Sequence, residues 1–181
     1  MKILIRRINI LFVFLVIVSV EVVSAVLYTK STLAVGEEKS RRENEILVQV
    51  NSAQLTEDEQ KTLDLINEYR KENGLGELKP LSSLQTVAKL KAEDLVNNEY
   101  FSHTSEQLGT PFEMLRNNNI NYKIAGENLA GNINRERAVK AWINSPSHRE
   151  NILEDRFEYT GICAIDSPIY GRVYVQIFIG I

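Results

Sequence analysis

The sequence has a single cysteine, Cys163, so it can form neither an intramolecular disulfide nor a zinc site built from cysteine ligands. The net charge is also small, since 21 Lys and Arg against 24 Asp and Glu give −3. Nucleic-acid-binding domains carry a basic surface, so this balance argues against a nucleic-acid partner. Hydrophobic residues make up 44% of the 181 residues, which is typical of a globular protein. The fold must therefore depend on its core rather than on cross-links.

The N-terminus combines three basic residues within its first seven positions with an apolar run from Ile10 to Val20. A Val-Ser-Ala site ending at Ala25 follows, so residues 1–29 are typical of a cleavable signal peptide. The alternative is an uncleaved signal anchor, because residues 8–28 are about long enough to span a bilayer. Glu21 disfavours the anchor, since a carboxylate is costly inside a membrane. Both interpretations stay open, and both predict a domain outside the cytoplasm, either secreted or membrane-anchored.

The rest of the chain divides into a linker and one domain. Residues 30–54 are predicted to be a flexible linker, because they are polar and carry a dense charged patch at Glu37–Arg42. The domain is predicted over residues 55–181, beginning at a helix-capping signal. No repeat or low-complexity stretch interrupts it.

Capping signals and apolar spacing predict four helices in the first part of this domain. Capping-box patterns open the first two helices, a proline in the first turn marks the start of the third, and a proline ends the fourth. The segments that carry these signals are Thr56–Glu59, Ser82–Gln85, Thr110–Glu113 and Asn134–Asn144.

The last part of the chain predicts an antiparallel hairpin. Tyr159–Ile165 and Arg172–Ile179 are rich in β-branched and aromatic residues, with turn residues between them. Both faces of the second strand are largely apolar, which indicates a sheet covered by helices on both sides. The fold class is therefore α+β. Cys163 lies within the first strand, where a packed small hydrophobe is the expected role rather than a nucleophile.

The chain has only two histidines, His103 and His148, and both are predicted in loops at the ends of elements. Side chains in such loops can point into a cleft, and imidazole can ligate a metal or transfer a proton near neutral pH. The alternative is that each is an exposed or capping loop residue, because their spacing lacks a local metal-ligand pattern such as His-Glu-x-x-His.

A third candidate is Glu127, next to Asn128 in the segment Ala125–Gly131. The glycines that flank this pair allow a tight turn and a close approach to other groups. A carboxylate there could orient a histidine or bind a cation, and the alternative is an ordinary polar turn. The segment lacks the ending of a phosphate-binding loop, and the chain has no Gly-x-Ser-x-Gly elbow of a serine hydrolase.

Four motifs occur in a characteristic order: Leu65-Ile-Asn-Glu-Tyr-Arg70, Tyr100-Phe-Ser-His103, Gly126-Glu-Asn-Leu-Ala130 and Ala141-Trp-Ile-Asn-Ser-Pro-Ser-His-Arg-Glu-Asn-Ile-Leu153. Together they resemble the successive signatures of the CAP (SCP-like) superfamily of cysteine-rich secretory, antigen-5 and pathogenesis-related proteins. The similarity covers roughly residues 55–181 and is closest to the cysteine-poor bacterial branch.

This resemblance implies an α-β-α sandwich whose cleft holds two histidines and two acidic residues. By motif, His103, Glu127 and His148 match three of these four groups, with Asn128 as a neighbour. Ser145 stands near the place where many members have the second acid, so a complete acid–histidine set and strong metal binding are not expected. The two histidines could at most hold a divalent cation such as zinc or calcium.

Two functions are compatible with these features, because a fold alone does not fix an activity. The first is a binding module that holds an extracellular small molecule, lipid, peptide or cell-envelope component, with the N-terminal segment at the membrane. The second is a metal-assisted hydrolase or protease, with His103 and His148 as ligands and Glu127 as the general base. Catalytic zinc normally has three protein ligands, and this set leaves either the ligands or the base one short. The sequence therefore favours binding over catalysis.

Overall fold

The computed structural model describes residues 27–39 and 54–181, and the chain divides into two units, residues 1–49 and 50–181. Residues 27–39 are helical, with the Thr32 hydroxyl donating to the Tyr28 and Thr29 carbonyls. The predicted linker, residues 30–54, is helical over residues 30–39, and residues 40–53 of it lie outside the described residues. Most of the predicted signal peptide or anchor, residues 1–26, lies outside the described residues. Within the described ranges, no helix is long and apolar enough to cross a membrane.

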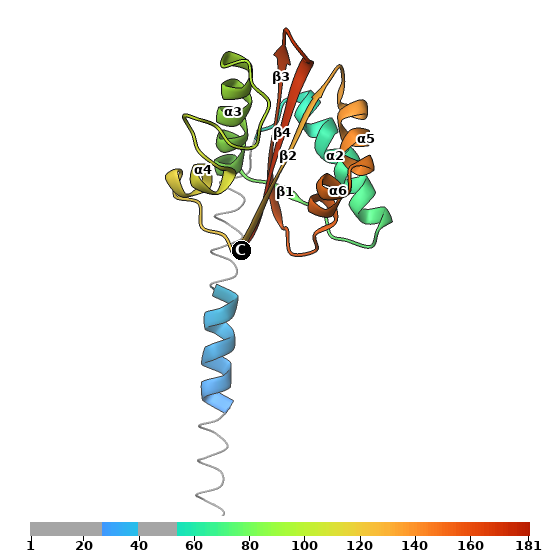
Figure 1. Cartoon of the computed structure of the whole chain (residues 1–181). Coiled ribbons are helices and arrows are strands. Elements are labelled where there is room, and N and C mark those ends of the chain that lie inside the picture. The colour runs from blue at the N-terminus through green and yellow to red at the C-terminus, as the bar shows by residue number, and fades with distance from the viewer. Residues whose placement is uncertain (1–26, 40–53) are drawn as a thin grey trace, which may run out of the picture. The chain divides into compact units, whose positions relative to one another are not determined.

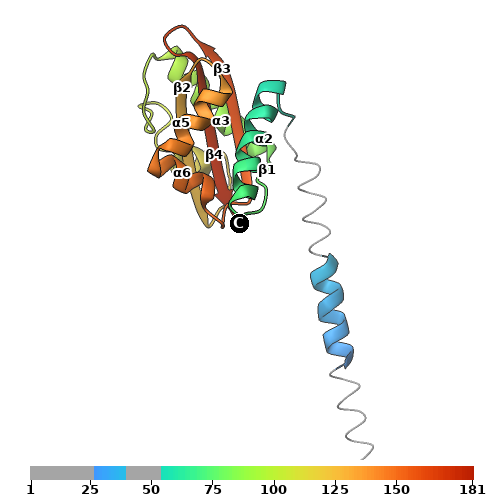
Figure 2. The same ribbon diagram turned by 90° about the vertical axis from the view of Figure 1, so that its right-hand side faces the viewer.

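The second unit is a three-layer α-β-α sandwich, as the sequence predicts. Its elements, in chain order, are α2 (Glu57–Glu72), β1 (Lys79–Pro80), α3 (Ser82–Asn97), α4 (Pro111–Asn117), β2 (Ile124–Asn132), α5 (Arg135–Asn144), α6 (Pro146–Leu153), β3 (Tyr159–Ser167) and β4 (Gly171–Gly180). Figure 1 shows α3 and α4 on one side of the sheet and α2, α5 and α6 on the other, and Figure 2 shows the sheet behind α5 and α6.

The sheet has the strand order β1-β3-β4-β2. The predicted hairpin is confirmed, since β3 and β4 pair antiparallel along their length. β2 pairs antiparallel with the other side of β4, whereas the short β1 pairs parallel with β3. The sheet is therefore mixed rather than purely antiparallel. β2 forms one of its two edges and carries Glu127.

A hydrophobic core lies on each face of the sheet because β4 buries both of its faces. Val173, Val175 and Ile177 pack against α3, whereas Tyr174 and Phe178 pack against the α2, α5 and α6 layer. Trp142 of α5 is 1% exposed and belongs to the second core. Cys163 is buried in the first core, as expected for a packed small hydrophobe, and burial raises the pKa of its thiol to about 12.

One of the two predicted capping boxes is confirmed, and so is the helix start predicted at Thr110, which also proves to be a capping box. Thr56 with Glu59 begins α2, and Thr110 with Glu113 begins α4. The capping box predicted at Ser82–Gln85 is wrong, because α3 follows directly from β1 and no side chain caps its first turn. The amide of Gln85 instead bonds the main chain of Ile162 in β3, accepting from its N–H at 2.9 Å and donating to its carbonyl.

The region around Pro146 also differs from the prediction. Pro146 does end α5, but it is at the same time the first residue of α6. Proline suits that position because the first turn of a helix needs no N–H donor from it. His148, predicted in a loop, therefore lies in the first turn of α6.

Candidate functional site

Glu127 lies in the edge strand β2 and not in the polar turn that its flanking glycines suggested. The glycines serve close packing instead. A Cβ on Gly126 would lie 2.9 Å from the Asn151 amide oxygen, and one on Gly131 would lie 2.9 Å from the Tyr170 ring. Because side chains alternate along a strand, Glu127 points to the α3 side of the sheet, as its neighbour Leu129 does.

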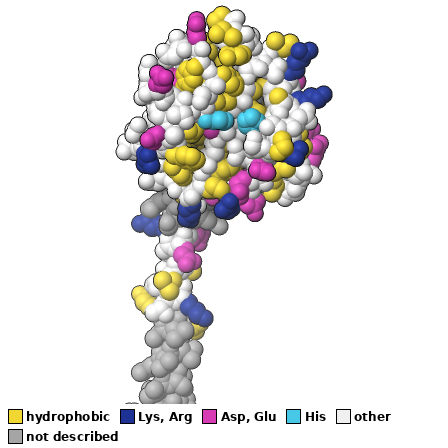
Figure 3. All heavy atoms as spheres, viewed as in Figure 1, with side chains coloured by type: hydrophobic (Ala, Val, Ile, Leu, Met, Phe, Trp, Pro, Cys, Tyr) yellow, Lys and Arg dark blue, Asp and Glu magenta, His cyan; other side chains and the backbone are white. Residues whose placement is uncertain are grey.

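The structure brings His103, Glu127 and His148 together at this edge. The Nδ1–H of His103 donates to Glu127 Oε1 at 2.6 Å, and the two imidazole ring centroids lie 6.3 Å apart. His103 comes from the loop after α3, and His148 comes from α6. These two helices cover opposite faces of the sheet, so each helical layer contributes one histidine at the edge formed by β2. Figure 3 shows the two histidines side by side on this surface.

The three side chains differ sharply in burial. The His103 side chain is 54% exposed, whereas that of Glu127 is 2% exposed. Burial raises the pKa of the Glu127 carboxyl, and the hydrogen bond from His103 and the positive charge of Lys91 oppose this shift. Glu127 Oε2 is buried without a hydrogen-bond partner among the residues that the structure describes. Burial, and then the charge of His103, lower the pKa of His148.

A polar network beneath the surface holds the loop of His103 in place. Lys91 of α3 is fully buried, and its ammonium group donates to the Tyr100 hydroxyl at 2.9 Å. That hydroxyl donates in turn to Asp94, and burial together with this contact raises the pKa of Tyr100 to about 12. Ser105 is also buried, and its hydroxyl accepts from the Leu108 N–H at 2.9 Å. His103 thus lies between Tyr100 and Ser105, two residues that buried hydrogen bonds hold in place.

Sequence reasoning missed this network, although a signal for it exists. Lys91 falls on the apolar stripe of its helix, seven positions after Leu84 and four before Leu95. A lysine at such a position must either leave the core or find partners within it. The structure shows the second outcome, and this buried cation is the charge that most directly offsets Glu127.

Asn128, predicted as a neighbour of the site, fixes α6 to β2. Its amide donates to the His148 carbonyl at 3.0 Å and accepts from Asn151 at 2.9 Å. Asn151 also donates to the Glu127 carbonyl at 3.1 Å. Ser145, the other predicted neighbour, joins α5 to α6 through its main chain, and its hydroxyl does not cap α6.

The donor set of the site is small for a metal centre. Within residues 27–39 and 54–181, no three His, Cys, Asp or Glu side chains are placed to hold one metal ion. The two imidazoles and a carboxylate already bonded to one of them do not form a closed coordination shell. Strong metal binding is therefore not supported by the residues present.

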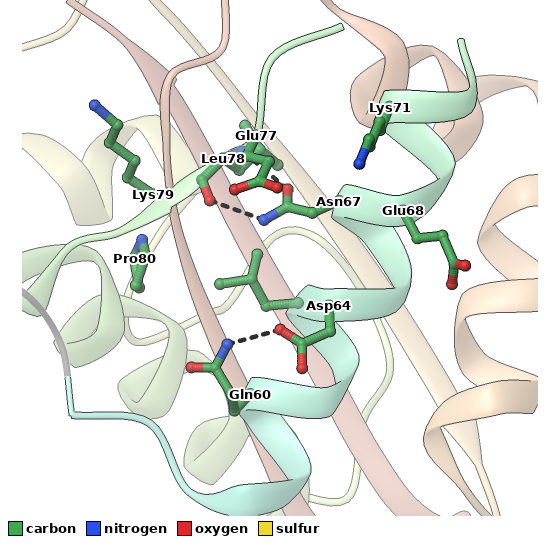
Figure 4. A pocket seen from close by; sticks show the side chains of 10 residues that line it. Gln60, Asp64, Asn67, Glu68, Lys71, Glu77, Leu78, Lys79 and Pro80 are labelled. Atoms are coloured by element: carbon green, nitrogen blue, oxygen red, sulfur yellow. Dashed lines mark hydrogen bonds between the residues drawn. The ribbon is translucent and has the colours of Figure 1, made fainter. Parts of the chain in front are cut away.

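Two hollows elsewhere on the domain contain none of the predicted site residues. One, of about 540 Å³, lies between α2 and β1 and includes Asp64, Asn67 and Lys79 (Figure 4). The side chain of Asn67 bonds the main chain just before β1, accepting from the Leu78 N–H at 2.9 Å. The other, of about 260 Å³, lies between α2 and α5.

The sequence model of the family described as CAP, cysteine-rich secretory protein family, matches residues 63–178. The uncharacterized Bacillus subtilis protein YkwD is 40% identical over 123 residues, which cover 67% of this chain and 47% of that protein. The uncharacterized Bacillus subtilis membrane protein YlbC is 32% identical over 122 residues, 67% of this chain and 35% of that protein. The chain thus spans less than half the length of each of these relatives.

Solved structures show the same fold. An extracellular protein containing an SCP domain from Bacillus anthracis aligns with a TM-score of 0.64 and 31% identity, covering 72% of this chain and 45% of that chain. An outer surface protein from Borrelia burgdorferi aligns with a TM-score of 0.65 and 28% identity, covering 71% of this chain and 96% of that chain.

Proposed function

Since this chain belongs to the CAP, or cysteine-rich secretory protein, family, we propose that its domain is an extracytoplasmic binding module that holds a ligand at His103, Glu127 and His148. The membership confirms the resemblance seen in the sequence motifs. Two observations support the location: one relative is described as extracellular and another as an outer surface protein, and the N-terminus has the features of an export signal.

The observation that carries the proposal is the buried carboxylate behind a half-exposed imidazole. Because Glu127 accepts from Nδ1 of His103, it fixes the orientation of that ring and leaves its other nitrogen for a ligand. His148 presents a second imidazole 6.3 Å away, centroid to centroid. Two neighbouring imidazoles suit a polar group of a lipid, a peptide or another cell-envelope component.

A metal-assisted hydrolase is the second candidate, and one observation favours it. A carboxylate bonded to a histidine is the usual support of a metal-ligating imidazole. In that function His103 and His148 would hold a zinc or calcium ion, and the ion would activate a water molecule. Glu127 would then be committed to His103, and among the described residues no other carboxylate completes a set of three metal ligands. The donor set therefore favours binding.

The two functions can be separated by NMR, because the chain has only two histidines and hence two imidazole signals. The purified protein would be titrated with acetate, inorganic phosphate and a short neutral peptide as probes of ligand chemistry. We expect one of these classes to shift both imidazole signals together, and His103→Ala to remove the response. Glu127→Gln keeps an oxygen acceptor without the charge and should weaken binding rather than abolish it.

The hydrolase is tested on the same samples. Generic peptides would be incubated with the protein in the presence and absence of zinc and calcium, and the products measured by mass spectrometry. Metal-dependent cleavage that Glu127→Gln abolishes would overturn the proposal of a non-catalytic module.

A further inference from the structure

An apolar patch lies at one end of the domain, around the turn between β3 and β4. It consists of Phe101, Ile133, Ile169 and Tyr170. The rings of Phe101 and Tyr170 have centroids 5.1 Å apart, and the Ile133 Cα lies 3.4 Å from the place of a Cβ on Gly171. Phe101, Ile133 and Ile169 are 41%, 60% and 54% exposed. Large apolar side chains exposed side by side indicate an interaction surface.

Figure 3 shows hydrophobic side chains gathered above the two histidines on this face. The members of the patch come from three separate segments: the loop after α3, the residue after β2, and the β3–β4 turn. The strand register brings the last two together, because Asn132 pairs with Arg172 and Ser167 pairs with Gly171. The patch is thus made of connecting segments at one end of the sheet, which is where membrane-inserting residues can protrude without disturbing a core.

The chain enters the domain at this same end. Asp58, in the first turn of α2, binds Arg172 at the start of β4 at 2.8 Å and Arg135 at the start of α5 at 2.6 Å. Glu59 accepts from the N–H of Ala164, close to the end of β3, at 3.4 Å. The first turn of α2, where the domain begins, therefore lies at the same end of the sheet as the apolar patch.

We propose that this end of the domain docks on the surface of a lipid bilayer, with the apolar patch inserted at the interface. The proposal rests on the proposed extracytoplasmic location but not on a ligand at the histidines. If the N-terminal run stays in the membrane, only residues 27–54 separate it from the domain. The helix of residues 27–39 is about 20 Å long, and each of residues 40–54 can span at most about 3.5 Å, so the domain cannot lie more than about 70 Å from the bilayer. Such a tether raises the effective concentration of the patch at the membrane, and a weak interaction then suffices.

Charge contributes little to this docking. Arg135 and Arg172, the basic side chains beside the turn, are both paired with Asp58, and Arg172 also contacts Asp166 at 3.2 Å. Attraction to anionic lipids needs unpaired basic clusters, whereas insertion of apolar side chains does not. Docking should therefore be equal on neutral vesicles and on vesicles with anionic lipid, and it should resist added salt.

The experiment uses the full chain reconstituted into phosphatidylcholine vesicles. The native Cys163 is buried and its thiol has a pKa raised to about 12, so it will not react with a label. Ile169→Cys would carry an environment-sensitive fluorophore in the patch. Glu77→Cys, exposed in the loop between α2 and β1 at the opposite end of the sheet, is the matched control. Nitroxide groups on the lipids then quench any label at the interface.

We expect the label at position 169 to be quenched and blue-shifted, and the label at position 77 to be neither. Adding Ile133→Asp should reduce the quenching at position 169 by about fivefold or more, because a carboxylate is costly at the interface. Unchanged Trp142 fluorescence would show that this variant is folded. His103→Ala should leave the quenching unchanged, so failure of the ligand site cannot be mistaken for failure of docking.

Three outcomes would overturn the proposal. Equal quenching at positions 169 and 77 would show that the patch has no preference for lipid. Quenching that requires anionic lipid would assign docking to charge rather than to the patch. A blue shift at position 169 without lipid quenching, rising with the protein-to-lipid ratio, would assign the patch to a second copy of the chain.

Discussion

Trp142 is the residue whose replacement tests most directly how the core supports the candidate site. It is the only tryptophan, it is 1% exposed, and its Nε1–H donates to the Leu129 carbonyl at 2.9 Å. The side chain therefore contributes both packing in the α2, α5 and α6 core and one hydrogen bond to the edge strand. Leu129 lies two residues from Glu127, so the bond also holds the strand that carries the site.

The two contributions can be separated by two substitutions. Trp142→Ala removes both and leaves a cavity, and we expect it to lower the free energy of unfolding by about 3–5 kcal/mol. Trp142→Phe keeps most of the ring but leaves the nearly buried Leu129 carbonyl without its donor, which costs about 1–3 kcal/mol together with a smaller packing loss. The alanine variant should therefore be less stable than the phenylalanine variant.

Urea unfolding followed by far-UV circular dichroism measures these differences, since both variants lack the fluorescent indole. Phe112→Ala is the matched control, because Phe112 is 47% exposed in α4 and its removal should change stability by less than about 1 kcal/mol. A loss below about 1 kcal/mol for Trp142→Ala would refute the assignment of Trp142 to the core.

Three further predictions concern charge and location. Burial raises the pKa of Glu127, so the folded state loses stability as the pH rises through that pKa and the buried carboxyl ionises. Glu127→Gln removes this ionisation, so it should raise the urea midpoint at pH 7 and have less effect near pH 4, where the carboxyl is neutral. The lowered pKa of His148 means that its neutral form stabilises the fold above about pH 6.5, a contribution lost on acidification. His148→Gln should therefore reduce the fall in melting temperature between pH 7 and pH 5, and an unchanged fall would exclude His148 as its cause. A reporter that is active only outside the cytoplasm, fused after Ile181, should be active, and activity only of a cytoplasmic reporter would contradict export.

Local signals in the sequence were sufficient for the elements and the layers. Thr56 and Thr110 begin helices because each has a glutamate three residues later, and this chemistry needs no tertiary contact. The apolar character of both faces of Arg172–Ile179 was enough to predict a sheet covered on both sides. The order of the motifs was enough to predict the family, and the two histidines and Glu127 were identified from those motifs.

The tertiary structure decided what these residues do. Gly126 and Gly131 suggest a turn in the sequence, but both lie in β2, which pairs with β4. Glycine is needed at these positions because Asn151 and Tyr170 occupy the space that a side chain would need. Pro146 both ends α5 and begins α6, which places His148 in a helix. Neither outcome is local. The glycines depend on residues more than twenty positions away, and the position of His148 depends on the packing of a second helix.

The same limit applies to the chemistry of the site. Sequence alone identifies Glu127, but only the assembled layers bury it, set it against the imidazole of His103 and place the buried cation of Lys91 behind it. The energy of a charge depends on the dielectric and on the groups around it, and these are properties of the folded surroundings rather than of the chain. The sequence therefore determined which groups were available, and the tertiary structure determined which of them share a surface and in what electrostatic environment.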